Sequence, residues 1–98
     1  MKALLMHEPR GALTIEDVPD PACPPDGVVI EVEACGVCRS DHHSWTGADP
    51  VPLPHIMGHE FAGTVIETGD TKLQKGQRIT APFILACGHC DDCNAGNP

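Results

Sequence analysis

Apolar and polar residues alternate in short stretches along much of this chain, and these stretches predict strands. The clearest is VVIEVEA at residues 28–34, where one face carries only apolar residues and the other carries two glutamates. A period of two residues is typical of a strand with one buried face, so Val28, Ile30 and Val32 are expected to point inward. Similar patterns predict further strands at residues 1–6, 12–18, 60–69 and 76–83.

Turns and breaks separate these stretches. The proline-rich residues 19–27 cannot join a central sheet, because proline has no backbone N–H to donate. Only one helix is expected, over CRSDHHSW at residues 38–45, and Gly47 should end it. Several short strands with glycine and proline between them predict a small β-barrel or sandwich.

Composition and charge narrow the class of protein. A length of 98 residues allows one domain with a modest core. The net charge of −8 repels nucleic-acid phosphates and anionic membranes, and the aromatic content of 3% gives no platform for stacking bases. No signal-peptide pattern and no apolar run of membrane length is present. We therefore expect a cytoplasmic protein with neither nucleic-acid nor membrane partners.

Six cysteines and six histidines are a high count for this length. In a reducing cytosol such cysteines are metal ligands or small buried groups rather than disulfides. The potential ligands gather at residues 35–43, 55–60 and 87–93. This pairing of residue types favours metal binding.

Two single-site interpretations fit the pattern poorly. A zinc ribbon needs two cysteine pairs close in sequence, whereas the pairs at residues 35–38 and 87–90 are far apart. It also leaves Cys93 and the histidines unused. A thioredoxin-like redox role for the first pair requires a βαβ pattern around it, and the sequence has none.

Two separate metal sites account for the residues better. Cys87, Cys90 and Cys93 are too close together to be three independent core residues, and a closed, thiolate-rich site is structural. Cys38 and His59 would give mixed sulfur and nitrogen ligation, with room for a third ligand and a labile water or substrate oxygen. Such an open position is typical of catalytic zinc.

Four motifs carry a resemblance to a known family: ACGVCRSDHHSWTG at 34–47, MGHEFAGTVIETG at 57–69, KGQRI at 75–79 and CGHCDDCNAGNP at 87–98. In this order they resemble the N-terminal part of the zinc-dependent medium-chain alcohol dehydrogenases. The resemblance implies a mainly β fold, a GroES-like partly open β-barrel with one or two short helices over residues 1–98. In the family a Rossmann domain follows and binds NAD or NADP, but no Gly-x-Gly-x-x-Gly motif occurs here.

The family pattern also places ligands outside this sequence. It implies a fourth structural cysteine just past Pro98 and a third catalytic cysteine later still. We therefore expect the sequence to be truncated within a zinc loop of about residues 86–98. The isolated chain is expected to bind at most about one zinc tightly and to oxidise no alcohol.

The resemblance assigns roles to individual residues of the open site. Cys38 would bind zinc as a thiolate and His59 as a neutral imidazole, whose other nitrogen is oriented by Asp41. Glu60 resembles the family's glutamate beside the metal, so it is expected to belong to the metal site.

Three residues of the predicted helix resemble those that handle the proton and the cofactor. Ser40 matches the hydroxyl that passes on the alcohol proton, and His43 the histidine that delivers it to solvent. Spacing alone turns His42 toward the metal, but Ser40 and His43 share a helix face, so His43 is preferred. Arg39 matches a position that contacts the cofactor pyrophosphate.

The implied function is oxidation of an alcohol to an aldehyde or ketone, by hydride transfer to NAD or NADP, in a homodimeric or homotetrameric enzyme. The alternative is a non-catalytic zinc-binding or subunit-interaction module. A metal-free GroES-like co-chaperone is a third candidate, against which the Cys38 and His59 pair argues. Elsewhere, Cys35 is expected to be buried, Trp45 to line a substrate pocket or pack on the barrel, and His55 to be only a weak alternative ligand.

Overall fold

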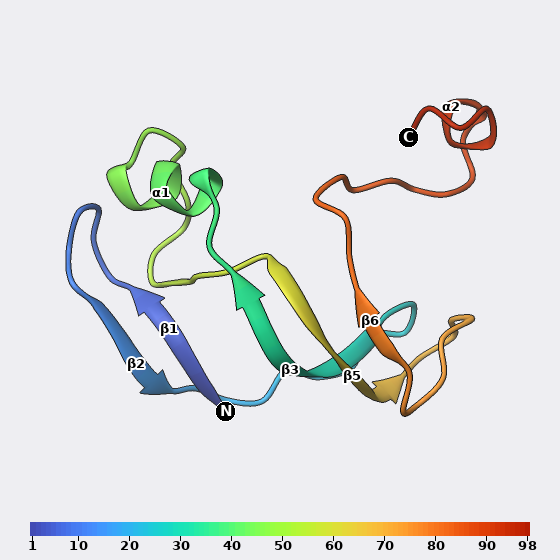
Figure 1. Ribbon diagram of the computed structural model, residues 1–98, viewed down its shortest axis with the longest axis horizontal. Coiled ribbons are helices and arrows are strands. Elements are labelled where there is room, and N and C mark those ends of the chain that lie inside the picture. The colour runs from blue at the N-terminus through green and yellow to red at the C-terminus, as the bar shows by residue number, and fades with distance from the viewer.

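The computed structural model describes all residues from Met1 to Pro98, which form two three-stranded sheets and two short helices (Figure 1). The first sheet has the strand order β2–β1–β4, with β1 at Lys2–Met6, β2 at Leu13–Asp17 and β4 at His55–Ile56. The second has the order β3–β5–β6, with β3 at Val28–Gly36, β5 at Glu60–Thr68 and β6 at Arg78–Thr80. Helix α1 spans Arg39–Thr46 and helix α2 spans Asp91–Asn94. The expected mainly β, partly open architecture is confirmed.

Most of the predicted strands are observed. Those expected at residues 1–6, 12–18 and 60–69 end within one residue of β1, β2 and β5. The strand expected at residues 76–83 is confined to Arg78–Thr80, and Pro82 follows, which has no N–H for a ladder. The sequence pattern missed β4 and α2, which have two and four residues and are too short to show a period.

Strand β3 differs from its prediction in burial. Its pairing with β5 shifts register between Val29 and Ile30 and again between Val32 and Ala34. Each shift interrupts the two-residue period that would keep one face inward. Val32, expected to be buried, faces the open gap between the two sheets and is therefore 55% exposed.

Helix α1 begins and ends as the sequence predicts. Cys38 is its N-cap residue, and the Asp41 carboxylate accepts a hydrogen bond of 3.0 Å from the Cys38 backbone N–H. The helix ends at Gly47, whose φ of 83° lies in the left-handed region that glycine adopts without strain. Neither helix of the structure has the length and apolar character needed to cross a bilayer.

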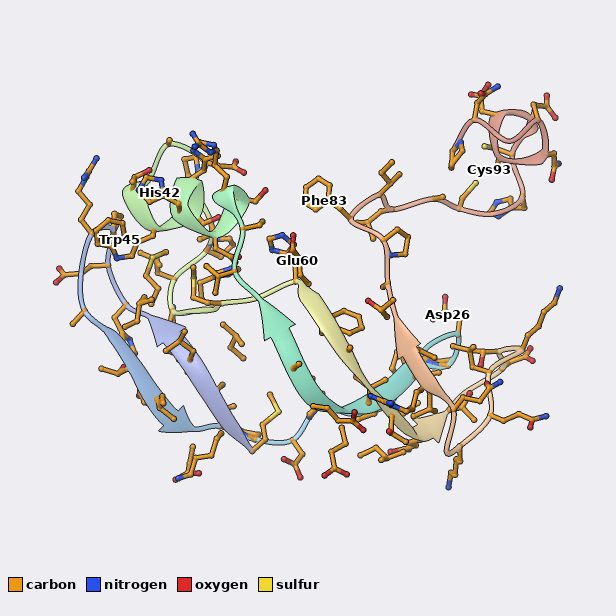
Figure 2. The ribbon with its side chains drawn as sticks, in the orientation of Figure 1. Asp26, His42, Trp45, Glu60, Phe83 and Cys93 are labelled. Atoms are coloured by element: carbon orange, nitrogen blue, oxygen red, sulfur yellow. The ribbon has the colours of Figure 1, made fainter.

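Trp45 attaches α1 to the turn between β1 and β2. Its indole N–H donates to the Gly11 carbonyl at 2.9 Å, and the Arg10 N–H donates to the Trp45 carbonyl at 2.7 Å. Of the two roles considered for Trp45, packing against the first sheet is the one observed (Figure 2).

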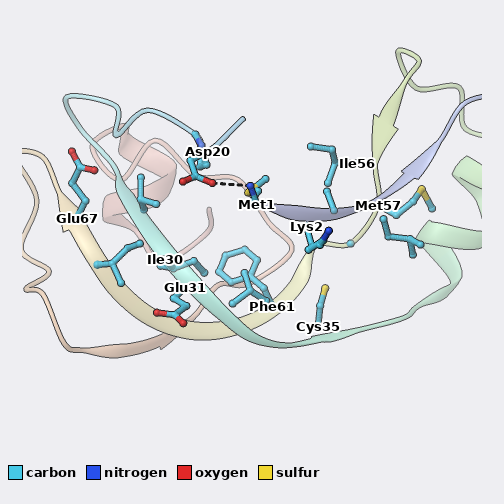
Figure 3. Close-up of a pocket in the computed structure, with 17 residues that line it drawn as sticks. Met1, Lys2, Asp20, Ile30, Glu31, Cys35, Ile56, Met57, Phe61 and Glu67 are labelled. Carbon is cyan, nitrogen blue, oxygen red and sulfur yellow. Dashed lines mark ion pairs between the residues drawn. The ribbon is translucent and has the colours of Figure 1, made fainter. Parts of the chain in front are cut away.

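The core is small and consists mainly of residues of β1. The buried apolar residues are Ala3, Leu5, Met6 and Val65. Between the two sheets is an open cavity of about 610 Å³, lined from both sides by residues such as Ile30, Ile56 and Phe61 (Figure 3). This cavity is where the barrel stays open.

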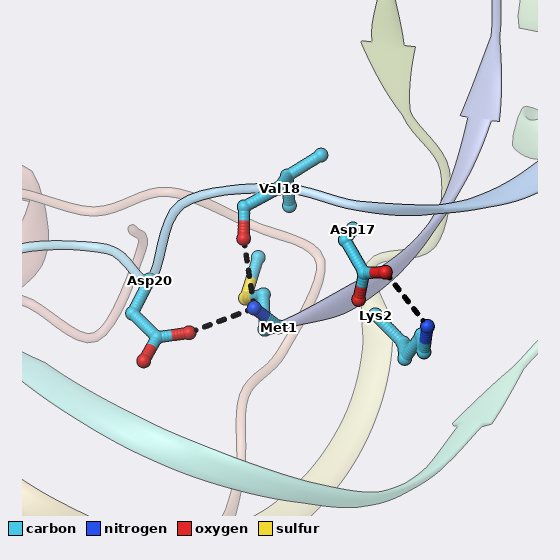
Figure 4. Close-up of polar contacts among 5 residues, drawn as sticks. All are labelled: Met1, Lys2, Asp17, Val18 and Asp20. Atoms are coloured by element: carbon cyan, nitrogen blue, oxygen red, sulfur yellow. Dashed lines mark hydrogen bonds and ion pairs between the residues drawn. The ribbon is translucent and has the colours of Figure 1, made fainter.

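At the cavity rim, polar contacts hold the N-terminus against the loop after β2 (Figure 4). The Met1 amino group donates to the Val18 carbonyl at 2.7 Å and pairs with Asp20 at 2.9 Å, while Lys2 pairs with Asp17 at 2.8 Å. Both ion pairs are exposed, so they position the strand end and contribute little to stability.

Candidate metal centre

Cys38 and His59 meet at one end of the second sheet. Cys38 lies at the start of α1, and His59 directly precedes β5. Although 21 positions separate them in sequence, the Cys38 Sγ lies 3.0 Å from the His59 Nε2. The structure therefore brings together the two side chains that the sequence singles out for the open site.

Glu60 completes this cluster. One ligand atom each of Cys38, His59 and Glu60 lies within 4.8 Å of the other two. Glu60 pairs with Gly36 across β3 and β5, and a Cβ on Gly36 would lie 2.5 Å from a Glu60 carboxylate oxygen. The glycine therefore leaves room for the Glu60 carboxylate, which Figure 2 shows at the start of β5. We call the cluster of Cys38, His59 and Glu60 the open site.

Asp41 lies behind the imidazole of His59. Its Oδ1 is 3.5 Å from the His59 Nδ1, and its Oδ2 accepts the hydrogen bond from the Cys38 N–H. The Asp41 side chain is only 10% exposed. One carboxylate thus contacts both the ring of one ligand and the backbone of the other, which leaves Nε2 directed at Cys38.

The donor set of the open site fits zinc. A thiolate, an imidazole and a carboxylate are all zinc ligands, at distances of about 2.0–2.3 Å from the ion. Donors arranged tetrahedrally at those distances lie roughly 3.3–3.8 Å apart. Here the Cys38 Sγ and His59 Nε2 are somewhat closer, at 3.0 Å, and all three donors lie within 4.8 Å of one another. Three protein ligands also leave a fourth position free.

The helix residues assigned to the proton and the cofactor are not joined into a chain of hydrogen bonds. Ser40 is half-buried on α1, whereas Arg39 and His43 are exposed. No side-chain hydrogen bond connects Ser40 with His43, and His42 packs its ring at 6.0 Å from that of Trp45. His55, in β4, pairs with Met6 of β1 and lies outside the ligand cluster.

Three cysteines near the C-terminus, Cys87, Cys90 and Cys93, form a second cluster, which we call the cysteine lobe; Figure 2 shows Cys93 in it. The Sγ atoms of Cys87 and Cys93 lie 3.8 Å apart, the spacing of two thiolates on one zinc. The Cys90 N–H donates to the Cys87 Sγ at 3.3 Å, and the Cys93 N–H donates to the Cys90 Sγ at 3.5 Å. These donors stabilise negative sulfur, so the lobe also fits zinc.

Backbone donors lower the pKa of Cys87 from 9.0 to about 7, the N–H of His89 being the largest cause and that of Cys90 the next. The thiolate is the reactive form, so in the metal-free chain Cys87 should reach half-maximal alkylation by iodoacetamide near pH 7. Peptide mass spectrometry across pH 5–10 measures this, with zinc-loaded chain as the protected control. A midpoint near pH 9 would contradict the prediction.

Two residues differ from what the sequence suggested. Cys35, expected to be buried, is exposed, because it lines the open cavity between the sheets. Phe83 was not singled out, yet its ring centroid lies 5.5 Å from that of His59. No local pattern marks this contact, since the two residues meet only through the path of the chain after β6.

Comparison with known proteins agrees with this geometry. Residues 24–98 match the family model of the alcohol dehydrogenase GroES-like domain. The L-threonine 3-dehydrogenase of Chelativorans sp. is 38% identical over 98% of this chain, which spans 30% of that relative. The chain thus spans about a third of the length of the relatives that it matches.

Two solved structures are similar as well. The cobalt- and zinc-bound thermostable alcohol dehydrogenase of Pyrobaculum aerophilum is 35% identical, with a TM-score of 0.86 over 99% of this chain and 31% of its own. A putative zinc-binding dehydrogenase of Sinorhizobium meliloti bound to NADP is 37% identical, with a TM-score of 0.78 over 97% of this chain and 28% of its own. The chain belongs to the family of alcohol dehydrogenase GroES-like domains.

Proposed function

We propose that this chain is the metal-binding N-terminal part of a zinc-dependent alcohol dehydrogenase, which oxidises an alcohol to an aldehyde or ketone by hydride transfer to NAD or NADP. The observation that carries the proposal is the open site, with Asp41 behind the His59 ring. A purely structural zinc module would need only a closed ligand set such as the cysteine lobe. The similar proteins are dehydrogenases, which supports catalysis over that alternative.

In this proposal, Cys38, His59 and Glu60 hold the zinc ion, which supplies Lewis acidity to the substrate oxygen when bound. Cys38 contributes a negative sulfur at the start of α1, and Asp41 keeps the imidazole oriented. The carboxylate of Glu60, exposed at the start of β5, is the ligand best able to exchange with substrate.

The exposed face of α1 is assigned to the proton and the cofactor. Ser40 takes the proton from the alcohol and His43 passes it to solvent, since both belong to α1 at a spacing of three residues. Arg39, exposed and without an ion-pair partner, is available to the cofactor pyrophosphate. A nicotinamide cofactor held there would supply the acceptor for the hydride.

The cysteine lobe is proposed to hold a structural zinc. Its three thiolates need a fourth ligand to close the site, whereas the open site has only one thiolate among its three donors. The isolated 98-residue chain should therefore bind at most about one zinc tightly and oxidise no alcohol by itself. The complete enzyme is proposed to be cytoplasmic, because both clusters require reduced cysteines. The family resemblance implies that it is a homodimer or homotetramer.

A fusion protein tests the proposal. This chain replaces the matching 30% of the Chelativorans L-threonine 3-dehydrogenase, and the zinc-loaded product is assayed with L-threonine and simple alcohols, using NAD⁺ and NADP⁺. We expect alcohol-dependent cofactor reduction in the fusion and none in its Cys38→Ser version. A folded, zinc-loaded fusion that reduces neither cofactor with any alcohol would refute the proposal.

A further inference from the structure

The segment between β6 and the cysteine lobe crosses the open site with almost no attachment to the sheets. Its apolar residues are largely exposed: Phe83 is 75% exposed, Ile84 59% and Leu85 98%. Every hydrogen bond made by residues 83–98 stays within that stretch. Packing therefore has to hold this part of the chain in place.

Phe83 provides the contact between this segment and the open site. Its ring and the His59 imidazole have centroids 5.5 Å apart and planes inclined at 59°. This is the tilted geometry, within 4.5–7 Å, in which aromatic pairs attract. The neighbouring Leu85 makes no comparable contact and is almost fully exposed.

The imidazole needs such a contact because its nitrogens alone do not fix it fully. The Nδ1 lies 3.5 Å from Asp41, which orients one side of the ring but is longer than an ordinary hydrogen bond. The Nε2 faces Cys38, and the side chain is still 33% exposed. A ring packed on the remaining carbon surface limits rotation of the imidazole about its bond to Cβ.

We propose that Phe83 is a positioning residue of the open site: it holds the His59 imidazole in its ligating orientation and anchors the start of the cysteine lobe there. This inference rests on the proposed function for the identity of the metal centre. Beyond that function, the metal affinity of the open site would depend on Phe83, which is not a ligand and lies in the segment that leads to the cysteine lobe.

The test uses cobalt(II), a spectroscopic substitute for zinc, bound to a chain in which Cys87, Cys90 and Cys93 are all serine. In this lobe-silenced chain, cobalt absorption comes from the open site alone. The substitutions should leave the sheets intact, because the lobe donates no hydrogen bond to them. We expect Phe83→Ala to weaken cobalt affinity about three- to tenfold, as lost aromatic packing predicts. Phe83→Tyr should restore it, and Leu85→Ala should leave it unchanged.

A second measurement is independent of metal. In the metal-free chain, the ring protons of His59 should shift in the NMR spectrum when Phe83→Leu removes the neighbouring ring current, and should not shift with Leu85→Ala. If Phe83→Ala and Leu85→Ala leave both cobalt affinity and the His59 resonances unchanged, the inference is wrong. A parent chain that binds no cobalt at the open site refutes the proposed metal centre instead, and the NMR shifts then decide only whether Phe83 packs on His59.

Discussion

A lobe-silenced chain that carries Cys38→Ser is expected to bind cobalt at the open site at least about a hundredfold more weakly than its parent. Removal of a group that only supports a ligand already costs 10–100-fold in metal affinity, so removal of a ligand should cost more. The sulfur-to-metal charge-transfer absorption should also disappear, because Cys38 is the only sulfur in the cluster. Titration monitored by that absorption, and by competition with a chelator, measures both effects.

Cys35→Ser is the matched control for this substitution. Cys35 lies three positions before Cys38, is also free, and lines the cavity without joining the ligand cluster. Its replacement should leave cobalt affinity and absorption unchanged. A loss of binding in Cys35→Ser equal to that in Cys38→Ser would instead show that Cys35 is itself a ligand and that the cluster of Cys38, His59 and Glu60 is misassigned.

The elements predictable from sequence are those whose cause is local. Helix α1 follows from a polar stretch that Gly47 ends in a left-handed conformation, and β5 follows from a stretch rich in Phe, Val, Ile and Thr, which favour strands. The three cysteines of the lobe were recognisable because close spacing alone keeps their sulfur atoms together. Such features depend little on the rest of the fold.

Features that depend on distant parts of the chain could not be predicted. Val32 and Cys35 are exposed because both line the open gap between the sheets. The meeting of Cys38 and His59 was expected from ligand chemistry and family resemblance, because spacing gives no distance across 21 positions. The contact of Phe83 with His59 had neither kind of signal.

The second large effect is expected from Asp41, through which the structure joins two ligands. Asp41→Ala removes the acceptor of the Cys38 N–H and the carboxylate beside the His59 Nδ1 together. We expect cobalt affinity at the open site to fall about 10–100-fold, the usual result of losing a partner behind a ligating histidine. The unpaired N–H should also cost about 1–3 kcal/mol of folding free energy, seen as a lower midpoint in thermal unfolding.

Asp41→Asn separates these two effects, because asparagine keeps an oxygen for the Cys38 N–H but has no negative charge for the imidazole. It should recover most of the thermal stability lost in Asp41→Ala while its cobalt affinity stays well below that of the parent chain. The carboxylate charge matters for metal because it raises the basicity of the ligating nitrogen and fixes which nitrogen carries the proton. If Asp41→Asn binds cobalt as tightly as the parent, Asp41 stabilises the start of α1 and has no part in the metal centre.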